Sequence, residues 1–283
     1  MERARDTYSF SHLTFQEYLT AQHVAQQPDL MQALVHQHLT DERWREVFLL
    51  VTGCLSNANP LLELMAAKTP TLLATDNLKD LVNWADTATA GSLGDYKPAA
   101  KRAAALFFAL ALAIVLVRFL ARSLVRALTF ALARSLAFTL DRSLTLALDR
   151  SLAFALDRSL AISLGISLAL DISSEFEKIK IFQQVDFTGL TARLSGLKAR
   201  VPEGEISDEI YQKFEQQLVQ IWCGALHLQP DWLELSEQEA NSLENYLSAN
   251  LLLLKCKEAA VRVSQQTWAG IEQRMLTVED RTS

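Results

Sequence analysis

Apolar residues recur at helical spacing along most of this chain. Between residues 28 and 90 they fall on one side of a helix with 3.6 residues per turn, and acidic residues precede them at residues 41–42. An example is the series Trp44, Val47, Phe48, Val51 and Leu55. Turn-forming sequences interrupt the pattern at residues 57–60, 68–71 and 91–95, which predicts short packed helices with short connections.

The C-terminal third shows the same kind of pattern. It predicts helices over residues 206–226, 236–263 and 267–276, separated by a Gln-Pro-Asp turn and a polar step at residues 264–266. Ser236 and Glu239 have the spacing of a capping box, in which each side chain bonds to a free backbone N–H of the first helical turn.

The middle of the chain is a low-complexity repeat. Every fourth residue from Leu112 to Leu168 is leucine, and an eight-residue unit, ALDRSLAF or a close variant, recurs over residues 139–162. A step of four residues advances a helix by about 400°, so the leucine stripe drifts by roughly 40° per step. The region is therefore either two or more helices with leucines on different faces, or one long helix contacted from all sides. A strand also fits an even period, but the abundance of Ala, Leu and Arg and the scarcity of turn residues favour helix.

An uncharged apolar run, residues 103–117, precedes the repeat. It is shorter than the ~20 residues that cross a bilayer, and extending it would bring Arg118, Arg122 and Arg126 to membrane depth. These features favour a buried core helix, with a surface-lying or re-entrant membrane helix as the alternative. Together the patterns predict an all-α fold, an array or bundle of antiparallel helix pairs with a long Leu-rich helical region in the middle.

Composition narrows the function classes. A net charge of −6 and a pI near 5.5 argue against a general nucleic-acid binder, which usually presents a basic face. Cys54, Cys223 and Cys256 lie far apart and form no zinc-binding pair, so we expect core thiols in a reducing cytoplasm. The opening residues MERARDTYSF lack the apolar core of a secretory signal, so export is not expected.

Candidate catalytic residues do not group in the sequence. The histidines are scattered, and the two that lie closest, His36 and His38, point to opposite sides of a helix. No G-x-S-x-G elbow occurs. We expect neither a catalytic residue nor a metal site. The five histidines are His12, His23, His36, His38 and His227.

Residues 8–21 read YSFSHLTFQEYLTA. This run resembles the closing motif of bacterial NACHT-family NTPases of the STAND class, where a strand-like F-x-H segment leads into a helix at the end of the winged-helix part. Residues 41–65 and 248–276 resemble the helical region that follows the NACHT module. The sequence departs from the family in having no G-x-x-x-x-G-K-[ST] phosphate-binding loop, so we expect no NTP hydrolysis by this chain alone.

The resemblance implies a domain order. Residues 1–27 would be the remnant of the winged-helix end, 28–100 a helical segment, 101–172 the Leu/Ala/Arg repeat helices and 173–283 the C-terminal helical domain. In the opening segment the spacing predicts Phe10, Leu13, Phe15, Tyr18 and Leu19 as core.

The resemblance also implies a function. The chain would be the sensor or regulatory helical region of a signalling NTPase, with a role in signal transduction or anti-phage defence. His12 would contact the β-phosphate of ADP, but only with a NACHT NTPase module in cis or trans; the chain itself would hold no cofactor. A ligand of unknown identity and a homo-oligomer are further expected partners. Two alternatives stay open: a membrane-associated helical protein anchored through residues 103–168, and a stand-alone helical scaffold for protein interaction.

Overall fold

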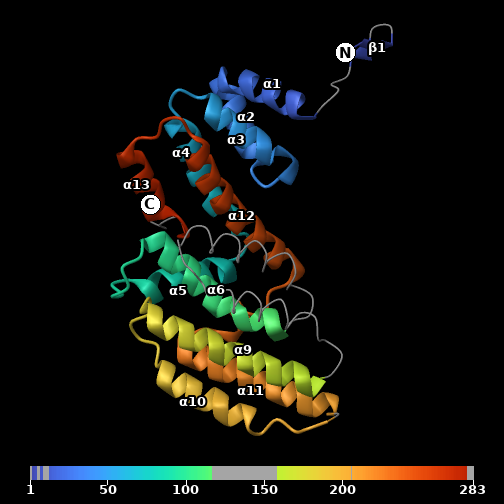
Figure 1. Cartoon of the computed structure of the whole chain (residues 1–283), viewed down its shortest axis with the longest axis vertical. Helices are drawn as coiled ribbons and strands as arrows, with labels where there is room; N and C mark the ends of the chain where they lie inside the picture. Colours follow the sequence, from blue (N-terminus) through green and yellow to red (C-terminus); the bar gives the residue numbers. More distant parts are fainter. Residues whose placement is uncertain (1, 5–6, 9–12, 117–157, 205, 279–283) are drawn as a thin grey trace. The chain divides into compact units, whose positions relative to one another are not determined.

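A computed structural model describes the chain except for residues 1, 5–6, 9–12, 117–157, 205 and 279–283 (Figure 1). Helices dominate the described residues, which confirms the predicted all-α class. Extended structure within them is limited to one short antiparallel hairpin of β1 (Glu2–Ala4) and β2 (Thr7–Tyr8), which the pattern did not predict. The predicted F-x-H segment at residues 10–12 and most of the leucine repeat lie outside the described residues.

The chain divides into two compact units, and each combines segments that are distant in sequence. Unit 1 contains residues 1–72 and 245–275, and unit 2 contains residues 73–244 and 276–283. The division at residue 244 falls inside helix α12 (Glu237–Ala259).

Unit 1 is built from short helices. Helix α1 packs on α2 and α3, and α4 packs on α2 and on the late helix α13. Its elements are α1 (Leu13–Ala25), α2 (Pro28–His38), η1 (Glu42–Trp44), α3 (Arg45–Cys54), α4 (Asn59–Lys68), η2 (Thr69–Leu72), the later part of α12, and α13 (Gln265–Arg274).

The core of unit 1 follows the predicted helical spacing. Phe48 and Val51 of α3 are fully buried, as is Met65 of α4. Backbone contacts join the start of α4 to the connection between α12 and α13: Ala58 N donates to Arg262 O at 3.1 Å, and Ser264 N donates to Asn59 Oδ1 at 3.0 Å. These two bonds hold the late segment of the chain against the early one.

Unit 2 consists of longer helices. Helices α9, α10 and α11 lie side by side, and α6 contacts α5, α9 and α11 (Figure 1). The elements are α5 (Asp76–Thr89), α6 (Pro98–Leu116), α9 (Arg158–Ile179), α10 (Phe187–Lys198), α11 (Asp208–Leu226), η3 (Pro230–Trp232) and the first part of α12.

The ring of Phe108 on α6 is the centre of the unit 2 core. It is fully buried, and its centroid lies 4.6 Å from the ring of Phe176 on α9 and 4.6 Å from that of Trp222 on α11. Phe182 and Phe187 lie at 5.4 and 5.7 Å. Such distances are those of favourable tilted aromatic pairs, so the Phe108 ring joins α6 to α9, α10, α11 and the loop before α10.

Helix α6 contains most of the apolar run at residues 103–117, for which the sequence pattern allowed either a buried core helix or a membrane helix. Every side chain from residue 103 to residue 110 is buried within unit 2, which confirms the core interpretation for that part of the run. Among the described residues, no helix combines the length and the apolar character that crossing a membrane requires.

Several helices of both units begin at a side-chain cap. Ser236 and Glu239 form the predicted capping box: Ser236 N donates to Glu239 Oε2 at 3.0 Å, and Glu239 N donates to Ser236 Oγ at 3.3 Å. Thr75 caps α5 and also donates its hydroxyl proton to Glu239 Oε1 at 2.9 Å. The hydrogen bonds from Ser236, followed by the one from Thr75, lower the pKa of Glu239. The starts of α5 and α12 are therefore fixed to each other.

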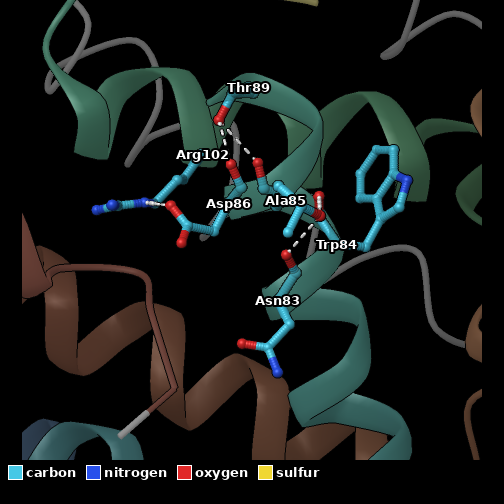
Figure 2. Close-up of polar contacts among 7 residues, drawn as sticks. Asn83, Trp84, Ala85, Asp86, Thr89 and Arg102 are labelled. Atoms are coloured by element: carbon cyan, nitrogen blue, oxygen red, sulfur yellow. Dashed lines mark hydrogen bonds and ion pairs between the residues drawn. The ribbon is translucent and has the colours of Figure 1, made fainter. Parts of the chain in front are cut away.

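An ion pair joins α5 to α6 in the same unit. Arg102 is 9% exposed although it carries a charge, and its Nε donates to Asp86 Oδ1 at 2.6 Å (Figure 2). Figure 2 also shows Thr89 bonding back to the α5 carbonyls of Ala85 and Asp86. Because a buried guanidinium is costly without a partner, Asp86 makes Arg102 compatible with the core.

We expect Asp86→Asn to lower the free energy of unfolding by about 1–2 kcal/mol, a modest value because the Asp86 side chain is 45% exposed. Urea unfolding measures the change. Asp80→Asn, at an exposed position of the same helix, is the matched control and should change stability little. Equal stabilities of the two variants would contradict the importance of the pair.

We expect Phe108→Ala to be far more damaging, with a loss of about 3–5 kcal/mol, because it removes the ring that all the neighbouring aromatic side chains contact. Thermal unfolding followed by circular dichroism measures it. A loss below about 1 kcal/mol would show that the cluster closes around the cavity and that Phe108 is not its centre.

Candidate interaction surface on helix α1

Helix α1 has apolar side chains around more than half of its circumference. One side turns toward α2 and α3, and on it Ala21 and Val24 are buried. At 100° per residue, Phe15, Tyr18 and Leu19 lie about 120–180° around the helix from Val24, and they are 55%, 42% and 46% exposed. Clustered exposed apolar groups of this kind mark interaction sites more often than isolated ones do. We call these three residues the α1 outer face.

This arrangement corrects the prediction that Leu13, Phe15, Tyr18 and Leu19 are core residues. Leu13 is 68% exposed, and the α1 outer face is also open. A helix that packs on one side leaves the rest of a wide apolar arc exposed, which accounts for Phe15, Tyr18 and Leu19. Leu13 lies about 20° around the helix from Val24, but it is the first residue of α1 and lines the pocket beside that helix. Phe10, the fifth residue of that prediction, lies outside the described residues.

A pocket of about 230 Å³ lies beside α1 within unit 1. Helix α1 supplies Leu13, Gln16, Glu17 and Thr20, and the opposite wall is formed by Arg43, Trp44 and Val47. The Trp44 ring is held from behind, since it stacks on His38 with centroids 4.0 Å apart and planes 11° from parallel.

The polar end of this wall is organised by Asp41. Its carboxylate caps η1 by accepting from Arg43 N at 3.0 Å, and it also accepts from Arg43 Nε at 3.0 Å and Nη2 at 2.7 Å. The side-chain bonds from Arg43, followed by the backbone bond, lower the pKa of Asp41 from 3.8 to about 2. The same contact raises the pKa of Arg43. The Arg43 guanidinium therefore faces Asp41 at the edge of the pocket, with its side chain 86% exposed.

The predicted nucleotide sensor His12 lies outside the described residues. The structure therefore does not bring it together with any other group, and its role stays a prediction. Among the described residues, no group of histidine, cysteine, aspartate and glutamate side chains is arranged to hold a metal ion.

The cysteines divide into two kinds. Cys223 and Cys256 are buried, and burial raises their pKa values to about 11 and about 12, so both thiols stay protonated and unreactive. Cys54 is exposed, so the expectation of three core thiols is wrong for it. Cys54 is the last residue of α3, and the last buried residue of that helix is Thr52, two positions earlier.

Comparison with known proteins gives one match. Residues 190–278 match the family model described as NACHT C-terminal Helical domain 2. The match confirms the resemblance seen in the tail and is consistent with the C-terminal part of a NACHT protein. No curated protein and no solved structure matches the chain. The matched segment runs from α10 to α13 and includes parts of both compact units.

The sequence contained a signal for the α1 outer face that the spacing rule overlooked. In the run from residue 15 to residue 24, the apolar residues 15, 18, 19, 21 and 24 spread over about 220° of the helix. So wide an apolar arc predicts that helices packing on one side of α1 leave part of it exposed.

We expect the carboxyl group of Asp41 to titrate with a pKa of about 2, and Arg43→Ala to return it toward the ordinary value near 3.9. Carbon-detected NMR across pH 1.5–6 measures both, with pH chosen to bracket these values. Because the folded-state pKa is lowered, the stabilising effect of this contact is present above pH 3.8 and is lost as the pH falls through about 2.

Arg45→Ala is the matched control, because Arg45 lies 3.7 Å from Glu42 and is not among the groups that shift Asp41. An unchanged Asp41 pKa in Arg43→Ala would contradict the proposed organisation of the pocket wall.

Proposed function

We propose that this chain is the C-terminal sensor and regulatory region of a NACHT-type signalling NTPase of the STAND class. It would act in the cytoplasm with a NACHT NTPase module supplied in cis or in trans. The match at residues 190–278 supports the family part of the proposal. The observation that carries the regulatory part is the α1 outer face, because its three apolar side chains are about half exposed within the motif that resembles the end of the winged helix.

The α1 outer face has the properties of a docking surface for that module. Burying the exposed halves of Phe15, Tyr18 and Leu19 would contribute on the order of 1 kcal/mol per side chain. Aromatic side chains are also the groups that most often dominate the energy of protein interfaces.

In this proposal the module binds and hydrolyses the nucleotide, and the helical chain controls its state. ADP keeps the chain folded onto the module, with His12 contacting the β-phosphate. Ligand binding and nucleotide exchange favour the released state, which oligomerises and signals, with anti-phage defence as the biological setting. A ligand shifts the equilibrium between the chain folded onto the module and the released chain only by the difference in its affinity for these two states.

The test is binding between this chain and a NACHT NTPase module of the same genome, produced as a separate polypeptide. We expect a complex that is tighter with ADP than with a non-hydrolysable ATP analogue. The triple variant Phe15→Ser/Tyr18→Ser/Leu19→Ser should weaken it at least about tenfold, because the apolar contact is lost. Isothermal titration calorimetry measures the affinities.

Leu93→Ser and Val261→Ser are matched controls, since both residues are exposed and apolar but lie outside α1. Circular dichroism should show equal helix content in all variants. Affinity unchanged by the triple substitution, or no complex with any nucleotide, would contradict the proposal. Self-association that depends on the α1 outer face would instead support the stand-alone scaffold.

A further inference from the structure

A second cavity lies in unit 2, far along the chain from α1. Its volume is about 260 Å³, and three segments meet there: the C-terminal half of α5, the loop at residues 183–185, and the end of α11. Helix α5 supplies Trp84, Thr87 and Ala88, and α11 ends at Leu226 and His227. The family match, the leucine repeat and the α1 outer face leave this cavity unexplained.

Hydrogen bonds within the protein join the walls of the cavity. Trp84 is 8% exposed, and its Nε1 donates to Leu226 O at 2.9 Å, which joins α5 to the end of α11. Gln183 Nε2 donates to Gly91 O, which joins the third segment to the loop after α5. Figure 2 shows that Trp84 leaves α5 on the side opposite to Asp86 and Arg102, so the ion pair is not part of this wall. The cavity is therefore pre-formed, which lowers the cost of ligand binding.

The lining is free of formal charge. It contains no carboxylate, ammonium or guanidinium group, and its apolar part is formed by Ala88, Val185, Leu226 and the Trp84 indole. A charged ligand would lose its hydration here without gaining a counter-charge, which is unfavourable. An uncharged ligand with an apolar body avoids this cost.

The polar groups of the lining are of mixed type. Gln183 donates one of its two amide N–H groups to Gly91 O, which leaves its carbonyl oxygen and the second N–H for a ligand. Thr87 donates to the carbonyls of Asn83 and Trp84, which leaves its hydroxyl lone pairs. Gln184 has no hydrogen-bond partner among the described residues and presents both a donor and an acceptor. A ligand that fits must therefore carry donors and acceptors close together.

His227 gives this edge of the cavity a defined backbone. It ends α11 in the left-handed region with φ of 54°, a conformation that costs a non-glycine residue about 1 kcal/mol. Glycine is the usual residue at such a helix end, and here an imidazole that lines the cavity takes its place. The imidazole adds one donor and one acceptor in its neutral form.

We propose that this cavity binds an uncharged, planar ring compound with neighbouring hydrogen-bond donors and acceptors, of the cyclic amide or nucleobase class. The ring lies against the apolar wall, and its polar edge bonds to the amides of Gln183 and Gln184 and to Thr87. The volume is slightly below the ~300–1,000 Å³ that is usual for ligand pockets, which suits a single or fused ring and excludes a nucleotide with its phosphates. The proposal does not depend on the NACHT assignment.

The test uses uracil and adenine as probes on the full chain, with binding followed by saturation-transfer NMR and isothermal titration calorimetry. We expect at least one base to bind with a Kd of about 1 mM or tighter, a realistic value for so small a ligand. The matched probe 1,3-dimethyluracil, which keeps the ring but has no N–H donor, should bind at least about fivefold more weakly.

Two substitutions locate the binding. Gln184→Leu removes an exposed amide and should weaken the base at least about fivefold, and Ala88→Phe should abolish binding by filling the cavity. Gln216→Leu, an exposed glutamine of α11 outside the lining, is the control and should bind like the unmodified chain.

Absence of binding by both bases would overturn the proposal. Equal binding by Gln184→Leu and the unmodified chain would also overturn it, as would equal affinity for uracil and its dimethyl analogue. The Gln184 side chain is exposed, so we expect Gln184→Leu to fold normally. This variant therefore tests the proposal even if Ala88→Phe disturbs the fold.

Discussion

The burial of one aromatic ring, that of Phe108, determines how unit 2 is assembled. Helices α6, α9 and α11 are far apart in sequence, yet each places an aromatic side chain against this ring or carries it. The Trp222 indole next to it also donates to the carbonyl of Ala109 at 3.3 Å, so the polar atom of the largest side chain is satisfied in the same place. A helix bundle can slide along its helix axes when its core consists of leucine alone. An aromatic cluster with a directed hydrogen bond fixes the relative position of the helices.

Local features of the fold followed directly from the sequence. The Ser236 and Glu239 cap, the turn before Asn59 and the burial of residues 103–110 all depend on near neighbours in the chain and on apolar content. The two-stranded hairpin was missed because two strands of three and two residues carry too little pattern to detect. Of the leucine stripe, the described side chains are those of Leu164, which is half-buried, and Leu168, which is buried.

The surfaces were harder to predict than the helices, for a physical reason. Periodicity reports which side chains share a face, but the neighbour that covers a face comes from distant sequence. Phe15 and Val24 belong to the same helix and are both apolar, yet Val24 is 7% exposed and Phe15 is 55% exposed. The cavity beside Trp84 is a similar case, because residues 84, 183 and 227 are brought together only by the fold.

The segment that matches the family model packs on helices that lie outside it in the sequence. Its first helices, α10 and α11, pack on α9, which precedes the match, and its last helix, α13, packs on α4, more than a hundred residues upstream. Excised at residues 190 and 278, the segment would separate Trp222 from Phe108, α10 from α9 and α13 from α4. It is therefore a recurring unit of sequence without being a unit of folding. Insertions, truncations or exchanges made at its edges would act on the stability of residues well outside it.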